Sequence, residues 1–281
     1  MTISNGKLLP AEVNRESIVR ELEVRANRHV PFIGSRGFEL DPLFQLTLVV
    51  LEEGAEVPQG IVVNYRGRAR GGRNFLLYSP EHPGEFRIEL TGVNNIIALG
   101  SDQRRKGRCQ IVGDNCLIAY LGDSPQANNS SSTIYDNGGV LFVGKNVSSN
   151  GANFAVGGDT GIYIGEDCML SWGIQIRSSD IHAVVDLEES RVLNYEQTVV
   201  LSPHVWVGPD VMVSKGVCVG AGSIIGGSSV VTKSVPRETL VVGTPAKIKR
   251  EHVSWTRRSP YRFEPSDYDA LRQQLLEFDS L

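Results

Sequence analysis

Residues Val205 to Val235 repeat a pattern every six positions, and this period is the strongest constraint on the fold. One phase is apolar throughout, and the phase four residues later is small or β-branched. The first comprises Val207, Val213, Val219, Ile225 and Val231, and the second comprises Val211, Val217, Ser223, Ser229 and Val235. A helix repeats apolar residues at three and four positions, so a period of six indicates short strands joined at regular corners. Three such units form a triangular coil, and stacked coils pair their backbones about 4.8 Å apart. The sequence therefore predicts a solenoid.

A corner motif extends the repeat upstream. Glycine, any residue, then Asn or Asp occurs in segments that begin at Gly92, Gly113, Gly144, Gly165 and Gly208. Asn, Asp and Gly tolerate the left-handed backbone that a tight corner requires. We therefore place the solenoid domain at residues 88–250, an N-terminal extension of unassigned role at 1–87, and a C-terminal tail and helix at 251–281.

Several segments depart from the period of six. Ile18, Leu22 and Ala26 predict a helix over residues 10–29, and residues 44–51 have the character of a buried strand. A capping box that begins at Ser266 predicts a C-terminal helix, with Leu271, Leu275 and Phe278 on one side. The polar segments 124–139 and 182–202 are expected to leave the solenoid as loops, where functional residues tend to lie.

The composition is that of a folded cytoplasmic protein, with 41% hydrophobic and 21% charged residues. A net charge of -4 gives no reason to expect a nucleic-acid partner. The first residues lack the apolar core of a signal peptide, and no apolar run is long enough to span a membrane. The cysteines follow no metal-binding spacing, so we expect no metal and interpret all four as reduced, buried, small apolar residues. They are Cys109, Cys116, Cys168 and Cys218.

Five motifs between residues 140 and 250 resemble those of the hexapeptide-repeat acyltransferases, and they are most similar to bacterial O-acetyltransferases of capsule and lipopolysaccharide sugars. The motifs are IGEDC, SDIH, VWVG, VVTKSVP and VGTPAK. The resemblance implies an all-β fold, a left-handed parallel β-helix with an N-terminal extension and a C-terminal helix. It also implies a homotrimer that transfers acetyl from acetyl-CoA to a hydroxyl of a sugar or polysaccharide.

Such a transfer needs a base for the hydroxyl proton, and the resemblance assigns this role to His182. His182 precedes Trp206 by 24 residues, which is the separation found in the family. From the residues alone, a structural histidine in a core or corner is the alternative. Trp206 either donates its indole N–H to an oxygen at the site or lines the groove beside the pantetheine arm. Asp180 either orients the imidazole or forms a corner.

The resemblance also assigns residues to the two substrates. For coenzyme A, Gly208 lies near the thioester, Gly227 admits the arm, Thr232 and Lys233 approach the pyrophosphate, and Lys247 and Arg250 meet the nucleotide phosphates. Without the resemblance, this basic cluster is interpreted as a solvated face.

Asn150 and Asn153 are candidates for binding the sugar or, equally, residues that form corners. A basic run is either a contact for an acidic glycan or a solvated edge; it comprises Arg66, Arg68, Arg70 and Arg73.

Three other functions fit the same scaffold. An N-acetyltransferase of an amino sugar differs only in the acceptor atom. A γ-type carbonic anhydrase needs three histidines around zinc, whereas this chain offers only His182 and His204 in the core, without the short spacing that such a site uses. A non-catalytic structural solenoid would not need the basic positions of the VVTK and PAK motifs.

Overall fold

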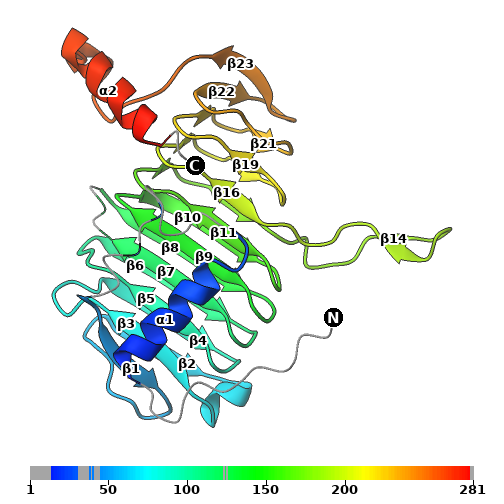
Figure 1. The fold of residues 1–281 in the computed structure, drawn as a ribbon. Helices are drawn as coiled ribbons and strands as arrows, with labels where there is room; N and C mark the ends of the chain where they lie inside the picture. Colours follow the sequence, from blue (N-terminus) through cyan, green and yellow to red (C-terminus); the bar gives the residue numbers. More distant parts are fainter. Residues whose placement is uncertain are drawn as a thin grey trace.

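The computed structural model describes residues 14–30, 38, 40, 45–122, 124 and 126–278. These residues form a stack of β-coils, with helix α1 (Arg15–Ala26) laid across one face and helix α2 (Pro265–Glu277) at the far end (Figure 1). The expected fold class, a left-handed parallel β-helix, is confirmed, and the stack has about eight turns.

Two long sheets run the length of the stack, and within the coils neighbouring strands are parallel. The first sheet consists, in spatial order, of β1 (Thr47–Leu51), β3 (Asn74–Tyr78), β5 (Ile96–Leu99), β7 (Leu117–Gly122), β9 (Val140–Lys145), β11 (Gly161–Ile164), β16 (Val199–Leu201) and β19 (Cys218–Val219). Its first pair, β1 with β3, is antiparallel.

The second sheet divides part-way along the stack. Its undivided part consists of β2 (Ile61–Tyr65), β4 (Glu85–Leu90), β6 (Arg105–Ile111), β8 (Asn128–Ile134) and β10 (Ser148–Val156). One branch continues through β12 (Met169–Leu170), β17 (Trp206–Val207), β20 (Ile224–Ile225), β22 (Thr239–Val242) and β23 (Lys247–Glu251). The other branch consists of β13 (Ile174–Arg177), β18 (Met212–Val213) and β21 (Val230–Val231).

The division changes the coil from two-sided to triangular. Ile96 pairs with Leu117, 21 residues later, whereas Val200 pairs with Cys218, 18 residues later. Strand β10 pairs with both β12 and β13, and its register to β8 shifts between Asn150 and Ala152. The intervening Gly151 has a φ of 145°, a conformation that only glycine adopts readily. This bulge therefore begins the bend that becomes the third corner.

The two columns predicted from the repeat form the core of the triangular part. Val207, Val213, Val219 and Ile225 are each 0% exposed, and the small phase from Val211 to Val235 is also buried. Each coil therefore shields the inward apolar side chains of the coil before it from water. The predicted corners are confirmed as well, because their Asn or Asp residues adopt left-handed φ angles between 55° and 60°. These residues are Asn94, Asn115, Asn146, Asp167 and Asp210.

The solenoid begins earlier than the expected boundary at residue 88. Strand β2 pairs in parallel with β4, and β3 pairs in parallel with β5, so the first coil starts near Ile61. Residues 61–87 therefore belong to the solenoid rather than to a separate extension. The six-residue period does not reveal these coils because their strands are four to seven residues long and make two sides instead of three.

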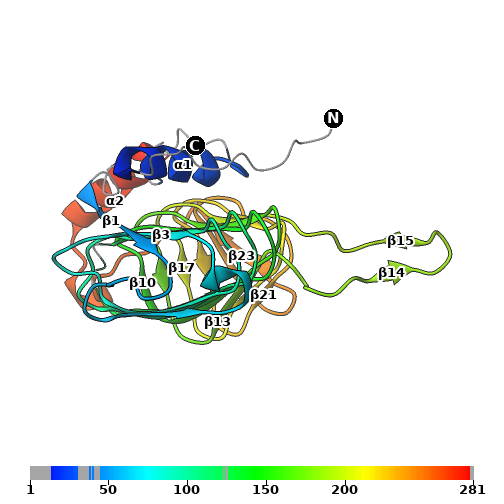
Figure 2. The same cartoon turned by 90° about the horizontal axis from the view of Figure 1, so that it is seen from below.

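Of the two loops expected from the sequence, one is confirmed. The described residues of the segment 124–139 do not form an excursion, because Asn128–Ile134 is strand β8, paired on both sides. Its inward Ser130 donates a hydrogen bond to the hydroxyl of Tyr120 at 3.0 Å, so polar residues fill this part of the interior. The segment from His182 to Gln197 does leave the stack. It forms a hairpin, β14 (Val185–Asp186) with β15 (Arg191–Val192), that projects far beyond the coils (Figure 2).

Both helices are confirmed, with altered ends. Helix α1 begins after Asn14, and the residues before it lie outside the described part of the chain. Its buried face, Ile18, Leu22 and Ala26, packs on the outside of the first sheet. Helix α2 is capped by Glu264 with Asp267, so the predicted cap at Ser266 is wrong by two residues.

Three of the four cysteines are buried as predicted, whereas Cys218 is exposed. Cys218 precedes Val219 of the apolar column, so the alternation of the strand turns its side chain outward. Burial raises the pKa of the Cys168 thiol to about 12, which keeps it protonated and non-nucleophilic near neutral pH.

Candidate active site

His182 lies where the projecting hairpin leaves the end of β13, and it is exposed. Three neighbours fix the backbone there. Asn194 donates hydrogen bonds from its side-chain amide to the Asp180 carboxylate and to the His182 carbonyl, each at 2.9 Å. Lys215, at the same corner one coil later, donates to the Asp180 carboxylate and to the Asn194 carbonyl. These bonds tie the two ends of the hairpin together and fix the position from which the imidazole projects.

Asp180 therefore acts as a corner residue that holds the hairpin. Hydrogen bonds from Lys215 and Asn194 hold the pKa of its carboxyl below the usual value, so it stays ionised near neutral pH. No hydrogen bond or ion pair between Asp180 and the His182 ring is present among the described residues. Of the two roles considered for Asp180, the structure supports the corner.

Trp206 begins strand β17, where it pairs with Met169 and Ile224, and its side chain is 38% exposed. His182 comes after β13, the last strand of one coil. Trp206 comes after β16, the first strand of the next coil, and begins β17. The full width of the face that contains β16 separates them. A single chain therefore presents these two residues at different corners of the triangle.

Gly208 and Gly227 have a structural reason to be glycine. A Cβ on Gly208 would lie 2.7 Å from the Gly227 nitrogen and 3.0 Å from the Ile225 oxygen, which is closer than carbon atoms approach. A Cβ on Gly227 would lie 3.2 Å from Pro209. The two glycines thus let successive corners stack directly, and the packing alone accounts for Gly208.

The predicted basic residues are all exposed but do not form one cluster. Val213 pairs with Val231, so Thr232 and Lys233 stack one coil above Ser214 and Lys215, on the edge that also carries His182. Lys247 and Arg250 lie instead on β23, which runs antiparallel to β22 at the end of the stack. The His182 edge thus has Lys215 and Lys233 along it, with β23 beyond.

The two candidate acceptor residues lie on β10, facing outward. Asn150 is at the bulge, and Asn153 pairs with Ser131 on one side and Gln175 on the other. Asn153 lines an open groove of about 440 Å³ together with Ser131, Gln175 and Lys106. Neither asparagine is at a corner with a left-handed backbone, so the corner-forming alternative does not explain them.

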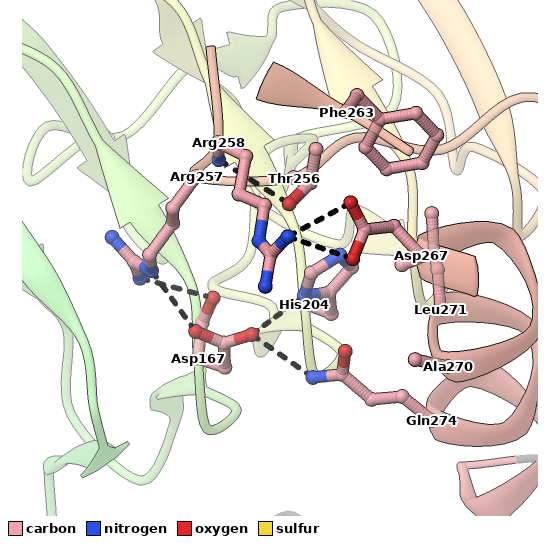
Figure 3. A pocket seen from close by; sticks show the side chains of 10 residues that line it. All are labelled: Asp167, His204, Thr256, Arg257, Arg258, Phe263, Asp267, Ala270, Leu271 and Gln274. Atoms are coloured by element: carbon pink, nitrogen blue, oxygen red, sulfur yellow. Dashed lines mark hydrogen bonds and ion pairs between the residues drawn. The ribbon is translucent and has the colours of Figure 1, made fainter. Parts of the chain in front are cut away.

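A buried cluster that the sequence did not reveal surrounds His204 (Figure 3). Its Nδ1 lies 2.7 Å from the Asp167 carboxylate, and its Nε2 lies 2.9 Å from the Trp255 carbonyl oxygen. Both ring nitrogens thus lie within hydrogen-bond distance of an oxygen of the protein. The ring stacks on Trp255, with centroids 4.3 Å apart. His204 therefore anchors the C-terminal segment and has no nitrogen free for a metal.

Two more side chains complete this anchor. Arg257 donates to the Asp167 carboxylate at 3.1 Å and to the carbonyls of Asn146 and Cys168. Gln274 of α2 donates to Asp167 at 3.1 Å. The hollow of about 340 Å³ at this place thus lies between the coils and α2, and its polar groups are used to hold the tail. In the sequence, the one signal for this cluster was that a corner aspartate could pair with basic residues of the C-terminal tail.

Two further observations concern the part of the chain that the structure describes. There, no helix has both the length and the apolar character to cross a membrane. The same residues contain no group of three or more His, Cys, Asp or Glu side chains arranged as metal ligands.

Known proteins resemble this chain in both sequence and fold. It is 40% identical over 121 residues to a polysialic acid O-acetyltransferase of Escherichia coli O1:K1 / APEC, and 28% identical over 128 residues to one of Neisseria meningitidis. Each match covers 43% of this chain, but only 39% and 56% of the respective relative. No protein-family model matches the chain.

The fold is similar over a longer stretch. The crystal structure of the polySia-specific acetyltransferase NeuO aligns with 76% of this chain and 94% of its own, with a TM-score of 0.58 and 25% identity. The polysialic acid O-acetyltransferase OatWY aligns with 75% of this chain and 99% of its own, with the same TM-score and 22% identity. The resemblance to the hexapeptide-repeat acyltransferases is confirmed. Among these acyltransferases, the polysialic acid O-acetyltransferases are similar to this chain in sequence as well as in fold.

The anchor at His204 predicts how stability depends on pH. Burial opposes ionisation of Asp167, but hydrogen bonds and charges from His204 and Arg257 outweigh it and lower its pKa below 3.8. A lowered folded-state pKa stabilises the fold above the unfolded value, and that contribution is lost as the pH falls through the folded value. We expect Asp167→Asn to lower the free energy of unfolding by about 1.5–3 kcal/mol at pH 7, and by progressively less below pH about 4.

Denaturant unfolding between pH 3 and 7 measures this effect. Asn tolerates the left-handed corner, so the substitution leaves the backbone unstrained. Asp210→Asn is the matched control, because Asp210 has the same corner conformation with a φ of 55°. Equal losses in both variants at pH 7 would contradict the role of the anchor.

Proposed function

We propose that this protein transfers acetyl from acetyl-CoA to a hydroxyl of a polysaccharide, a capsular glycan of the sialic acid type. The observation that carries the proposal is the exposed histidine fixed at the corner where the hairpin leaves the coil. The solenoid that carries this histidine aligns with the polySia-specific acetyltransferase NeuO over 94% of the NeuO chain. The acceptor class follows from the names of the two relatives.

His182 serves as the general base. A neutral ring nitrogen accepts the proton of the acceptor hydroxyl while that oxygen attacks the thioester carbonyl carbon. The tetrahedral intermediate collapses, the carbon–sulfur bond breaks, and the imidazolium returns its proton to the leaving thiolate. No covalent acyl-enzyme forms, in keeping with the raised pKa of the buried thiol of Cys168.

Coenzyme A lies along the His182 edge. Neighbouring coils are about 4.8 Å apart, so Lys233 lies about 10 Å further along the axis than the end of β13. An extended pantetheine arm that begins at His182 passes Lys215 and brings the pyrophosphate to Thr232 and Lys233. Lys247 and Arg250 on β23 then face the nucleotide phosphates, and the corner at Gly208 and Gly227 of an adjacent subunit forms the opposite wall.

The active assembly is a homotrimer with three sites at subunit boundaries. Trp206 is too far around the coil to face His182 of its own chain, so we place Trp206 of one subunit against His182 of the next. The hairpin supplies the contact, because its tip extends well beyond the coils (Figure 2). Its exposed apolar side chains are Val184, Val185, Leu187, Leu193 and Tyr195. A second copy buries them, and rotation about a threefold axis closes the assembly.

Replacing the base tests the mechanism. We expect His182→Ala to lower kcat by about 10² to 10⁴ while KM for acetyl-CoA stays nearly constant, since only proton transfer is removed. His82→Ala, at an exposed histidine in an early connection, should leave both constants unchanged. The assay uses acetyl-CoA with purified polysialic acid, and with an amino sugar to detect N-acetylation. Turnover near that of the parent in the His182 variant would remove this residue from the chemistry.

Removing two basic residues tests the cofactor path. Lys233→Ala combined with Arg250→Ala should raise KM for acetyl-CoA about tenfold with a smaller change in kcat, because contacts far from the thioester contribute mainly uniform binding. Arg262→Ala with Arg272→Ala removes the same charge from the C-terminal segment and serves as the control. If both pairs give the same KM, the nucleotide lies elsewhere.

A charge at the hairpin tip tests the assembly. Leu187 is 91% exposed in a single chain, so Leu187→Asp should not affect the folding of one subunit. In the trimer it places a carboxylate in an apolar contact, and we expect light scattering to show mainly monomer with reduced activity. Glu188→Ala is the control. An active monomer, or an intact trimer of the Leu187 variant, would contradict this arrangement of subunits.

A further inference from the structure

The outer face of the second sheet, from β4 to the first strand of one branch, β13, carries a row of basic and polar side chains parallel to the solenoid axis. Strand pairing puts these residues directly beside one another, from β4 through β6, β8 and β10 to β13. The row, called here the polar row, consists of Arg87, Arg108, Ser131, Asn153 and Gln175. Four steps between adjacent strands make it about 19 Å long.

The surface along the polar row is hollowed. One groove of about 520 Å³ includes Arg87 and Arg108 in its lining, and a second of about 440 Å³ includes Ser131, Asn153 and Gln175. Lys106 lines both, so the two grooves adjoin, and together they are called the depression here. Helix α1 covers the outside of the first sheet, whereas the described chain places no helix on this face (Figure 2).

The depression is positively charged, because the acidic side chains near it already have partners. Glu85 forms an ion pair with Lys106 at 3.3 Å, and Glu89 forms one with Arg66 at 3.9 Å. Arg87 and Arg108 are exposed and have no ion pair with any described residue. They face each other across neighbouring strands, where two like charges repel. This arrangement favours an anionic ligand between or above them.

A third arginine continues the basic surface toward the proposed base. Arg177 ends β13, two residues beyond Gln175 and on the same side of the strand. Its Nε is buried and has no hydrogen-bond partner in the described part of the chain. The Arg177 side chain as a whole is only partly buried, so its guanidinium can extend the basic surface toward a ligand. His182 follows only five residues later.

We propose that the polar row and Arg177 bind an extended anionic polysaccharide that carries one carboxylate on each of several successive sugars. This inference rests on the proposed function and adds where the acceptor lies. The carboxylate nearest the reacting hydroxyl meets Arg177, and more distant ones meet Arg108 and Arg87. Between them, Ser131, Asn153 and Gln175 offer hydroxyl and amide groups to the sugar hydroxyls.

The dimensions of the row determine the kind of ligand. A single sugar bound beside His182 cannot reach Arg108 and Arg87, which lie about 14 and 19 Å away along the axis, so only a polymer contacts the whole row. The surface offers guanidinium groups for carboxylates and uncharged groups between them, which suits a chain with charges at intervals. Arg87 and Arg108 are remote from the reacting atoms, so they strengthen binding of the acceptor without changing the chemical step.

The test compares long and short acceptors. In Arg87→Gln with Arg108→Gln, we expect KM for long polysialic acid to rise about tenfold, whereas KM for a sialic acid dimer, KM for acetyl-CoA and kcat stay constant. Raising the salt concentration should weaken binding of the long polymer to the parent more than to this variant. Arg177→Gln should raise KM for both acceptors. Arg20→Gln with Arg272→Gln removes the same charge from the two helices and is the control.

Equilibrium binding of the long polymer, measured without acetyl-CoA, separates this inference from the proposed function. Weaker binding to the Arg87 and Arg108 variant supports the site even if no acetyl transfer is detected, and the proposed function then fails alone. If the parent transfers acetyl to the polymer but this variant and the control behave alike, the function stands and the site is wrong. Failure of the parent to bind the polymer also overturns the site.

Discussion

The backbone pairing between successive coils determines the rest of this structure. Because each strand pairs with the strand one coil later, every residue lies beside the residue one coil before it, at a spacing of about 4.8 Å. The pairing is possible only if each coil closes at its corners, and left-handed Asn and Asp residues such as Asn115 and Asp210 close them. Register and corners together fix which side chains stack inward, and the apolar column from Val207 to Val231 follows from them.

The triangular half of the fold could be predicted from the sequence, and the two-sided half could not. From β17 to β21, each strand is two residues long and paired residues are 18 apart, so the column appears as a strict period of six. In the earlier half, paired residues are 21 to 25 apart, as Ile96 with Leu117 and Ile61 with Phe86 illustrate. Strand β8 was misread as a loop because serines that bond inside the coil look like surface residues in a sequence.

The candidate site was predictable where it depends on one residue and unpredictable where it depends on distant pairs. The position of His182 at the boundary between repeat and hairpin could be predicted, and its role as the base stays a prediction. The roles of Asp180 and His204 depended on Lys215 and Trp255, which are 35 and 51 residues away and come close only through coil stacking or the return of the tail. The polar row was hidden for the same reason, since its members lie on five different strands.

The hairpin shows how such a scaffold accepts a functional insertion without losing its order. Ile162 pairs with Val199 across 37 residues, and Gln175 pairs with Met212 across the same interval, yet the next coil returns to 18. The extra residues leave and rejoin at one corner, where Lys215, Asp180 and Asn194 close the gap with hydrogen bonds. Closing a longer loop costs little more free energy than closing a short one, since the cost grows only with the logarithm of its length. A corner can therefore gain an exposed histidine and an arm that extends past its own subunit while the coils on either side keep their register.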